Sequence, residues 1–492
     1  MSAPRAVLLH GGSVRTLDPA RPAARALFIA GDRIAAVLDD PADVPRGAER
    51  IDVAGGCVLP GFTDAHVHFP SWALARRELD LLGTRSVAEA AARVAAAAPS
   101  GGWIRGRGWR EALWPTGDIP SASALRADVP VALRAYDSHS LWLNAPALAL
   151  AAGDLESPGG VVERDAHGAP TGILREEAAW RFEARLAPER GEVLAAMRAA
   201  FPAVAAAGVV ALHDKDGGRD APTLFAALGP LPFDVWQSIP ADRLDAEHER
   251  GDYVKAFMDG TLGSRTARLL DGSGVEITSS AGLAEIIVRA AALRLPVAVH
   301  AIGDRANREA LDAFAATATT WRPLGLRHRI EHAQCVHPDD VPRFAQLGIT
   351  ASVQYAHATS DRDLADRLWG ERAAHSYPYG ALLAAGARLA GGSDAPVEPL
   401  DPLAGVRAAV LRTDGDRPPW RPEQAIGIDA ALASFTTAPA WLEGAEARRG
   451  ALRPGLAADV VVLDRDPHAD LAGARVAGAM RAGRWLIPPG SA

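Results

Sequence analysis

Short apolar runs alternate with longer alanine-rich stretches along the centre of the chain. Eight of the runs have strand length, and polar residues follow most of them: 58–68, 131–137, 209–214, 253–259, 297–301, 327–332, 349–354 and 388–394. Helical periodicity marks the stretches between most of them, such as 86–98, 192–207, 304–317 and 338–347, and Ser86 with Glu89 forms a capping-box pattern in the first. Eight strands that alternate with helices predict an α/β fold, a (β/α)8 TIM-like barrel with parallel strands.

The two ends of the chain have a sequence pattern typical of short β-strands and turns. Short strand-like runs separated by glycine and aspartate turns fill residues 6–57, and the same pattern occurs again from 450 to 481. We therefore expect a small β-sandwich built from both termini, residues 1–57 and 443–492, and a barrel formed by 58–442. A segment near 100–125, rich in tryptophan, glycine and proline, predicts an insertion whose tryptophans form either a local core or part of an apolar pocket.

Candidate metal ligands stand at the carboxyl ends of the predicted strands. His66 and His68 are one residue apart, so that their side chains point to the same face of a strand. Later strands end in His300, His332 and Asp394. Each residue alone is typical of a satisfied polar group, but barrel enzymes place their chemistry at these strand ends. Imidazoles and a carboxylate together suit zinc, which in catalytic sites keeps a position open for water and brings its pKa near 7.

Composition singles out two lysines. Of the 52 basic residues only Lys215 and Lys255 are lysines, and the rest are arginines. Lysine can lose its proton and react as an amine, whereas arginine effectively cannot. Lys255 lies inside an apolar run, where it could react with carbon dioxide to give a carbamate that bridges two metal ions; the alternative is a salt bridge to a distant acid. Lys215, between Asp214 and Asp216, is interpreted as a local ion pair or a substrate contact.

This set of residues resembles the metal site of the amidohydrolase superfamily. Three flanking segments, VKAFMDGTLGSRTA (254–267), VHAIGDRAN (299–307) and HRIEHA (328–333), are similar to the branch that contains N-substituted formamide deformylases, the amidohydrolase family 3 type. The likeness extends from about residue 5 to 470.

The resemblance implies a metal-dependent hydrolase of C–N bonds with a composite sandwich and a barrel. It implies that His66, His68 and Asp394 hold one ion, that His300 and His332 hold a second, and that carboxylated Lys255 bridges the two. Asp394 would also take a proton from the attacking water and deliver it to the leaving nitrogen. Some relatives work with one metal and an unmodified or absent lysine, so one or two ions are both open.

One departure from the branch is the sequence Gln354-Tyr355-Ala356-His357, which stands where Gln-Pro-x-His is common and which predicts a different loop path after the seventh strand. Further polar residues in strand ends and loops are candidates for contacts to substrate. They are His139, Glu176, Arg265, Asp304, Gln354 and His357. Asp304 has a second interpretation, as the cap of the helix that follows it.

Net charge and hydropathy limit the kinds of binding partner and the location that we expect for this protein. The net charge of -8 gives no basic surface for nucleic acid, so we expect a small-molecule substrate and no nucleic acid partner. The longest apolar run, 199–212, is interrupted by proline and glycine and is too short for a membrane span. No secretion signal is recognised, and Cys57 and Cys335 are interpreted as buried reduced thiols. These features predict a cytoplasmic enzyme, with homo-oligomerisation left open.

Three functions fit the sequence. The leading one is a metal-dependent amidohydrolase that acts on C–N bonds other than peptide bonds, in an amide, formamide or cyclic amide, by attack of metal-bound hydroxide. The alternative is a mononuclear deaminase or cyclic-amidine hydrolase that uses His66, His68, His300 and Asp394. A non-catalytic scaffold relative is the third, and it would be expected to have lost ligands. No residue in the loops identifies the substrate.

Overall fold

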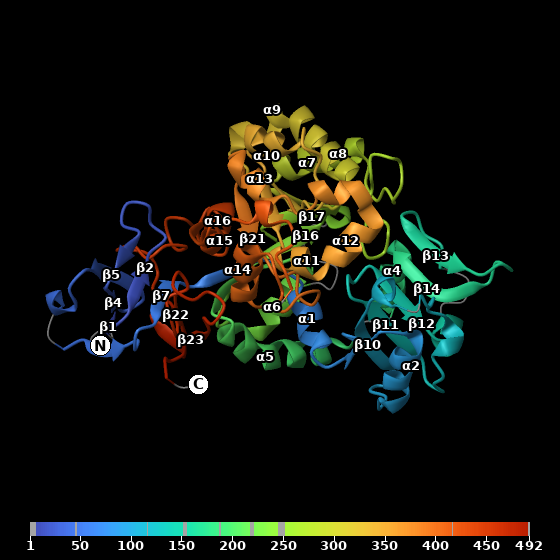
Figure 1. Ribbon diagram of the computed structural model, residues 1–492, viewed down its shortest axis with the longest axis horizontal. Helices are drawn as coiled ribbons and strands as arrows, with labels where there is room; N and C mark the ends of the chain where they lie inside the picture. Colours follow the sequence, from blue (N-terminus) through green and yellow to red (C-terminus); the bar gives the residue numbers. More distant parts are fainter. Residues whose placement is uncertain are drawn as a thin grey trace.

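Figure 1 shows three connected parts: a β-sandwich that holds both ends of the chain, a central barrel, and an inserted unit on the side away from the sandwich. The computed structural model describes residues 6–44, 47–115, 117–150, 155–185, 188–216, 221–244, 251–415 and 417–490.

The central barrel has eight parallel strands. In spatial order they are β8 (Phe62–Val67), β15 (Val209–Asp214), β16 (Asp234–Pro240), β17 (Tyr253–Phe257), β18 (Val297–Ala301), β19 (Arg329–His332), β20 (Thr350–Val353) and β21 (Leu389–Gly391). A parallel bridge between Val67 and Ala395 joins the last strand region to the first, and Asp394 N donates to His66 O at 2.7 Å. The predicted barrel is confirmed.

Helices connect the barrel strands, and two of them contribute side chains to a cavity. The helices include α1 (Phe69–Ala75), α5 (Arg190–Ala206), α6 (Ala221–Leu228), α7 (Ser280–Ala292), α8 (Asp304–Ala316), α9 (Ala318–Trp321), α10 (Val341–Leu347), α11 (Tyr355–Ser360), α12 (Arg362–Trp369), α13 (Tyr379–Ala384), α14 (Pro402–Leu411), α15 (Ile428–Ser434) and α16 (Thr437–Leu442). In α8 the residues Ala306, Ala310, Ala313 and Phe314 are all buried. Their helical spacing places one apolar face against the barrel.

One predicted barrel strand was assigned wrongly. Residues 131–135 form β11 (Val131–Ala135) in a separate sheet, whereas the true third barrel strand is β16. Polar Asp234 and Gln237 interrupt β16, and most of its side chains are only partly buried, so it lacks the continuous apolar pattern of a parallel strand. As a result 209–214 is the second strand rather than the third, while Lys255 remains on the fourth.

The insertion between β8 and β15 is larger than the predicted segment near 100–125. It contains a six-stranded sheet with β9 (Leu79–Asp80), β10 (Ile104–Trp109), β11, β12 (Ser140–Leu143), β13 (Gly160–Arg164) and β14 (Pro170–Glu176), and the helices α2 (Val87–Ala96), α3 (Ala145–Leu150) and α4 (Glu177–Arg185). Ser86 caps α2 by accepting from Glu89 N at 3.1 Å. Trp109, Trp114 and Trp142 pack with ring centroids 5.9–6.4 Å apart. These aromatic rings form a local core.

The sandwich draws its two sheets from both ends of the chain. One sheet contains β1 (Ala6–His10), β4 (Ala26–Ala30), β5 (Arg33–Leu38) and β6 (Glu49–Asp52); the other contains β2 (Ser13–Arg15), β3 (Ala23–Ala24), β7 (Cys57–Pro60), β22 (Val460–Leu463), β23 (Val476–Arg481) and β24 (Arg484–Ile487). Strand β22 pairs with β7. This arrangement confirms the sandwich predicted from both termini.

The single strand predicted over 58–68 divides at Gly61. Residues before it belong to β7 of the sandwich, and residues after it belong to β8 of the barrel. A Cβ atom at Gly61 would lie 2.7 Å from both Cγ atoms of Val210, so only glycine fits this crossing.

Two further predictions from the sequence concern membrane-spanning segments and the state of the two cysteines. No described helix is both long and apolar enough to cross a membrane. Cys57 and Cys335 are free and buried, and burial raises the pKa of the Cys57 thiol to about 12. Both thiols therefore stay protonated at neutral pH.

Candidate metal centre

Three side chains converge on one point where the first and eighth strands meet. His66 Nε2 and His68 Nε2 lie 3.2 and 3.3 Å from the same atom, Asp394 Oδ1. Ligands held about 2.0–2.2 Å from a tetrahedral zinc ion are themselves separated by roughly 3.3 Å. The three atoms therefore fit the ligand set of one divalent ion, and the nitrogen and oxygen donors suit it chemically.

Backbone geometry fixes this convergence. Asp394 has a φ of 59°, in the left-handed region that non-glycine residues adopt rarely and often at functional sites. Gly392 passes so close to the first strand that a Cβ atom there would lie 2.5 Å from His66 N. His68 N donates to Ala395 O at 2.9 Å. The backbone contacts of barrel closure thus hold the three side chains together.

His66 is oriented by a buried carboxylate. Its Nδ1 lies 2.8 Å from Glu331 Oε2, and both side chains are buried. A carboxylate accepts the Nδ1 proton, which leaves the Nε2 lone pair for an ion. Burial, opposed by Asp394 and Glu331, lowers the pKa of His66. The imidazole is therefore neutral at neutral pH, as a metal ligand requires.

His332 and His357 form a second group with Asp394. His332 Nδ1 and His357 Nε2 lie 4.0 and 3.9 Å from Asp394 Oδ2, so the carboxylate faces a histidine pair on each side. Gln354 accepts from His332 Nδ1 at 2.7 Å and lies 3.3 Å from His66 Nδ1. Gln354 therefore orients imidazoles, and His357, expected only as a substrate contact, also has the position of a metal ligand.

Tyr355 stands where the family resemblance led us to expect proline. It is buried as the first residue of α11, and its ring packs on Tyr379 with centroids 4.9 Å apart. Tyr379 Oη donates to Gln354 O at 3.0 Å. The two tyrosines thus support the backbone between Gln354 and His357, and His357 still faces Asp394.

His300 faces the same region, but its ring nitrogen Nε2 contacts the backbone of Gly260. Its Nε2 lies 3.1 Å from Gly260 O and 3.6 Å from Asp259 Oδ1, and its ring centroid is 4.5 Å from that of His332. Nδ1 is then the ring nitrogen left for an ion. Burial holds the pKa of His300 well below its usual value, and the nearby His332, Lys255 and His139 lower it further.

The two lysines differ in their partners. Lys255 is buried, its Nζ forms no hydrogen bond within the described part of the chain, and burial lowers its pKa to about 8 although Glu331 and Asp394 oppose the shift. Lys215 Nζ lies 2.8 Å from Glu331 Oε1. The salt bridge considered for Lys255 is not found among the described residues, and the ion pair of Lys215 is with Glu331 rather than with its sequence neighbours.

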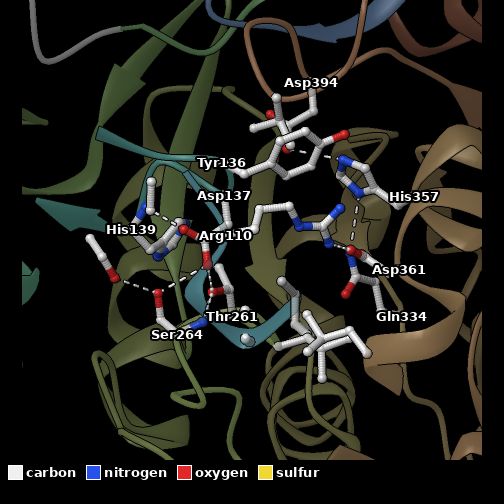
Figure 2. A pocket seen from close by; sticks show the side chains of 18 of the residues that line it. Arg110, Tyr136, Asp137, His139, Thr261, Ser264, Gln334, His357, Asp361 and Asp394 are labelled. Atoms are coloured by element: carbon white, nitrogen blue, oxygen red, sulfur yellow. Dashed lines mark hydrogen bonds and ion pairs between the residues drawn. The ribbon is translucent and has the colours of Figure 1, made fainter. Parts of the chain in front are cut away.

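The insertion supplies His139 to the same cavity. Its Nδ1 lies 2.6 Å from Glu176 Oε2, Thr266 Oγ1 donates to the other Glu176 oxygen, and its ring centroid is 5.3 Å from that of His300. Burial would lower the pKa of His139, but Glu176 outweighs it and raises the pKa. Glu176 therefore holds His139 in place, and Figure 2 shows His139 across the cavity from His357.

A cavity of about 650 Å³, part of it open to solvent, is lined by His139, His300, His332, His357 and Asp394. Its apolar lining consists of Trp109, Ala112, Ala135, Leu262, Ile302, Leu364 and Val397. On one wall of the cavity Arg110 lies 4.2 Å over the Tyr136 ring and pairs with Asp361, close to His357 (Figure 2). Tyr377 Oη donates to Asp361 Oδ2 at 2.8 Å. The arginine and aspartate of this wall neutralise each other.

Several cavity residues were not predicted from the sequence, chiefly Arg110, Tyr136, Asp361 and Gln334. They belong to the insertion and to segments beside α11, α12 and β19, and no local spacing marks them. Four of the six predicted substrate contacts do not line the cavity. Glu176 and Gln354 instead contact the imidazoles of His139 and His332. Arg265 is exposed in a turn, and Asp304 Oδ1 accepts from Leu270 N at 2.8 Å and Arg305 N at 2.9 Å at the start of α8.

Comparison with known proteins agrees with this geometry. The sequence profile of the amidohydrolase family matches residues 49–484, and the chain belongs to this family. Protein LONG AFTER FAR-RED 3 of Arabidopsis thaliana is 32% identical over 93% of this chain and 87% of its own length. An N-substituted formamide deformylase of Arthrobacter pascens is 29% identical over 95% of both chains. The predicted family resemblance is confirmed.

A solved structure with a similar fold supports the same family assignment. An uncharacterized metal-dependent hydrolase from Pyrococcus horikoshii OT3 has a TM-score of 0.74 and 29% identity, over 94% of this chain and 98% of that one. The family, this likeness and the clustered histidines and aspartate identify a hydrolase with a site for a divalent metal.

Proposed function

We propose that the protein hydrolyses the C–N bond of a small amide, formamide or cyclic amide that is not a peptide. The observation that carries the proposal is the trio His66, His68 and Asp394, of which Asp394 lines the cavity. Similarity to an N-substituted formamide deformylase over 95% of both chains supports the bond type.

We propose zinc as the ion, held by His66, His68 and Asp394, because neutral imidazoles and one carboxylate suit it. When bound, such an ion lowers the pKa of water toward neutrality and polarises a carbonyl oxygen. The remaining steps fall to the residues of the chain.

Asp394 has the position of the general acid and base. Its Oδ1 faces His66 and His68, while its Oδ2 faces His332 and His357 from 4.0 and 3.9 Å. Burial alone would raise the pKa of Asp394, but the surrounding imidazoles hold it well below its usual value. The carboxylate is therefore ionised, and its position between the two histidine pairs supports a role in accepting the proton of the attacking water and delivering it to the leaving nitrogen.

Lys255 supports a two-ion form of the site. Because its pKa is lowered to about 8, a useful fraction of the amine is neutral near that pH. The neutral Nζ would attack the carbon of carbon dioxide and release one proton, which gives a carbamate with two oxygen ligands. His300 Nδ1 and His332 would complete the second position.

The cavity lining suits an uncharged substrate. Arg110 and Asp361 neutralise each other, and Asp137 accepts from Thr261 Oγ1 at 2.6 Å and from Ser264 Oγ at 3.0 Å. Leu364 and Val397 give an apolar surface for a substituent on the nitrogen. We propose that His139 and His357 contact the carbonyl or the leaving group.

One observation favours the alternative of a mononuclear deaminase or cyclic-amidine hydrolase. The most compact group of donors, His66, His68 and Asp394, needs no second ion. A single-ion site would still use Asp394 for proton transfer.

Metal analysis and a substrate panel test these proposals together. We expect purified protein to bind zinc and to hydrolyse members of a panel of N-formyl, N-acyl and cyclic amides. Close to two equivalents of metal, with a mass increase at Lys255 from added carbon dioxide, supports the bridged form. About one equivalent with unmodified Lys255 and release of ammonia from an aminated heterocycle supports the alternative. Metal binding without turnover of any of these compounds supports a scaffold.

Location and assembly stay predictions. We propose a cytoplasmic enzyme with a small-molecule substrate, and the oligomeric state is open. Size-exclusion chromatography with light scattering measures that state.

A further inference from the structure

The only two lysines of this chain lie in the barrel near one carboxylate. Glu331 is fully buried, Lys215 Nζ lies 2.8 Å from its Oε1, and Glu331 is the strongest influence opposing the effect of burial on the pKa of Lys255. The proposed chemistry uses Lys255 and leaves Lys215 without a role.

Lys215 is separated from His66 by a single side chain. Glu331 Oε2 lies 2.8 Å from His66 Nδ1, and its other oxygen lies 2.8 Å from both Lys215 Nζ and Arg329 Nε. Two cations therefore flank the oxygen of Glu331 that does not face His66. A fixed, ionised carboxylate is what keeps the proton of His66 on Nδ1.

Lys215 and Arg329 hold Glu331 from different strands. Arg329 shares β19 with Glu331 and is also engaged by His213 Nδ1 at 2.7 Å. Lys215 follows β15, and its backbone N donates to Val67 O at 2.8 Å, beside His66 on β8. Both cations thus link the carboxylate to β8 beside His66: Lys215 through its backbone N, and Arg329 through Nη1, which donates to Ala65 O at 3.4 Å.

The two aspartates that flank Lys215 in the sequence bind the backbone of α1. Asp214 Oδ1 accepts from Phe69 N at 2.8 Å, and Asp216 Oδ2 accepts from Ser71 N at 2.7 Å, so both carboxylates bind the first turn of α1. The Lys215 side chain is 0% exposed, and Lys215 is not among the residues that line the cavity. These contacts leave no room for a direct contact to substrate.

We propose that Lys215 is a positioning residue for His66, acting through Glu331, so that it strengthens metal binding without touching the ion or the substrate. The inference rests on the proposed function, since it takes His66 as a metal ligand. It makes a prediction opposite to simple electrostatics. A buried ammonium near a divalent cation repels it, so its removal should tighten metal binding unless its effect is exerted through the position of Glu331.

The test is the affinity of the apoprotein for zinc, measured by competition with a chromophoric chelator. In Lys215→Met we expect the dissociation constant to rise by about 10- to 100-fold, the range found when groups that orient metal ligands are lost. In Lys215→Gln, which keeps one donor for Glu331, we expect a smaller rise. The visible spectrum of the cobalt-loaded protein should change in both, because the His66 ligand is displaced.

A double-mutant cycle identifies the route. If Lys215 acts through Glu331, Lys215→Met has little further effect on zinc affinity in a Glu331→Gln background. Additive effects would overturn the inference, as would unchanged or tighter zinc binding in Lys215→Met. Should Lys215→Met not fold, judged by circular dichroism, the comparison of Lys215→Gln with Glu331→Gln gives the same decision.

Arg134→Met is the matched control. Arg134 is a partly buried cation, with its side chain 12% exposed, between Glu78 and Glu183 in the insertion, at 3.5 and 2.8 Å. Its loss should lower the unfolding temperature and leave zinc affinity unchanged. Failure of the proposed function has a different signature: wild-type protein would bind no divalent ion, or His66→Ala would bind zinc as tightly as wild type.

Discussion

Asp394 Oδ1 lies 3.2 Å from His66 Nε2, across the seam where the eighth strand meets the first. The same seam carries the backbone hydrogen bond from Asp394 N to His66 O at 2.7 Å. Barrel closure and metal binding therefore depend on the same few residues.

Replacement of Asp394 by asparagine should remove both metal and turnover. The amide keeps the shape but cannot accept a proton, and general acid and base catalysis contributes about 10²–10⁴-fold in rate. We expect kcat to fall by at least that factor, together with a lower zinc content. Asp304→Asn, a carboxylate at the start of α8 and outside the cavity lining, is the control and should retain metal. Full metal and unchanged turnover in Asp394→Asn would refute the assignment.

Loss of Lys255 should abolish activity if a carbamate bridges two ions. In Lys255→Ala, short carboxylates such as acetate should restore part of the rate, because they can occupy the space of the carbamate. Metal analysis should show a drop toward one equivalent. Wild-type activity without added carboxylate would rule out the bridging role and favour the single-ion site.

Acid should destabilise the barrel through Glu443. Burial would raise the pKa of this carboxyl, but His213 at 2.7 Å and Arg449 outweigh it and lower the pKa to about 2 from 4.5. A lowered carboxyl pKa adds stability above the unfolded value and loses it as pH falls through the folded value, here between about pH 4.5 and 2. The contribution is about 3 kcal/mol at neutral pH.

The Glu443 prediction is checked on metal-free protein by urea unfolding at several pH values. Glu443→Gln should be less stable at neutral pH and should show a flatter dependence of unfolding free energy on pH below 4.5. Parallel curves for the variant and the wild type would show that the stability does not depend on ionisation of Glu443.

Leu364 should select the substituent on the substrate nitrogen. It lies in the apolar lining, and loss of apolar contact costs about 1–3 kcal/mol, or roughly 10- to 200-fold in kcat/KM. Leu364→Ala should lower kcat/KM for amides with bulky N-substituents and leave small amides nearly unchanged. An equal loss for both would place the substituent elsewhere. Val397→Ala provides an independent comparison on the same lining.

The sequence predicted the location of a site residue where a local pattern and the barrel topology fix the position of its side chain. His66, His68 and Asp394 could be predicted to converge because strand alternation and barrel topology bring strand ends together. The partner of Lys215 could not, because Glu331 is distant in sequence and nothing local marks the contact. Arg110 and Asp361 likewise meet only through packing of the insertion against α12. Strand β16 was missed because its partly buried side chains do not form an apolar run.

Gly61 joins the sandwich to the barrel, and this has a consequence for synthesis. Gly61 N donates to Asp459 O at 2.9 Å and Thr63 N donates to Phe435 O at 2.7 Å, while β7 pairs with β22. Although β8 also pairs with β15, the start of the strand that carries His66 thus depends on partners near the carboxyl end of the chain. During translation it leaves the ribosome early but is fixed late, so the candidate metal centre can be completed only when the polypeptide is nearly finished. A prematurely terminated chain would lack the centre although it contains both histidines of the first strand.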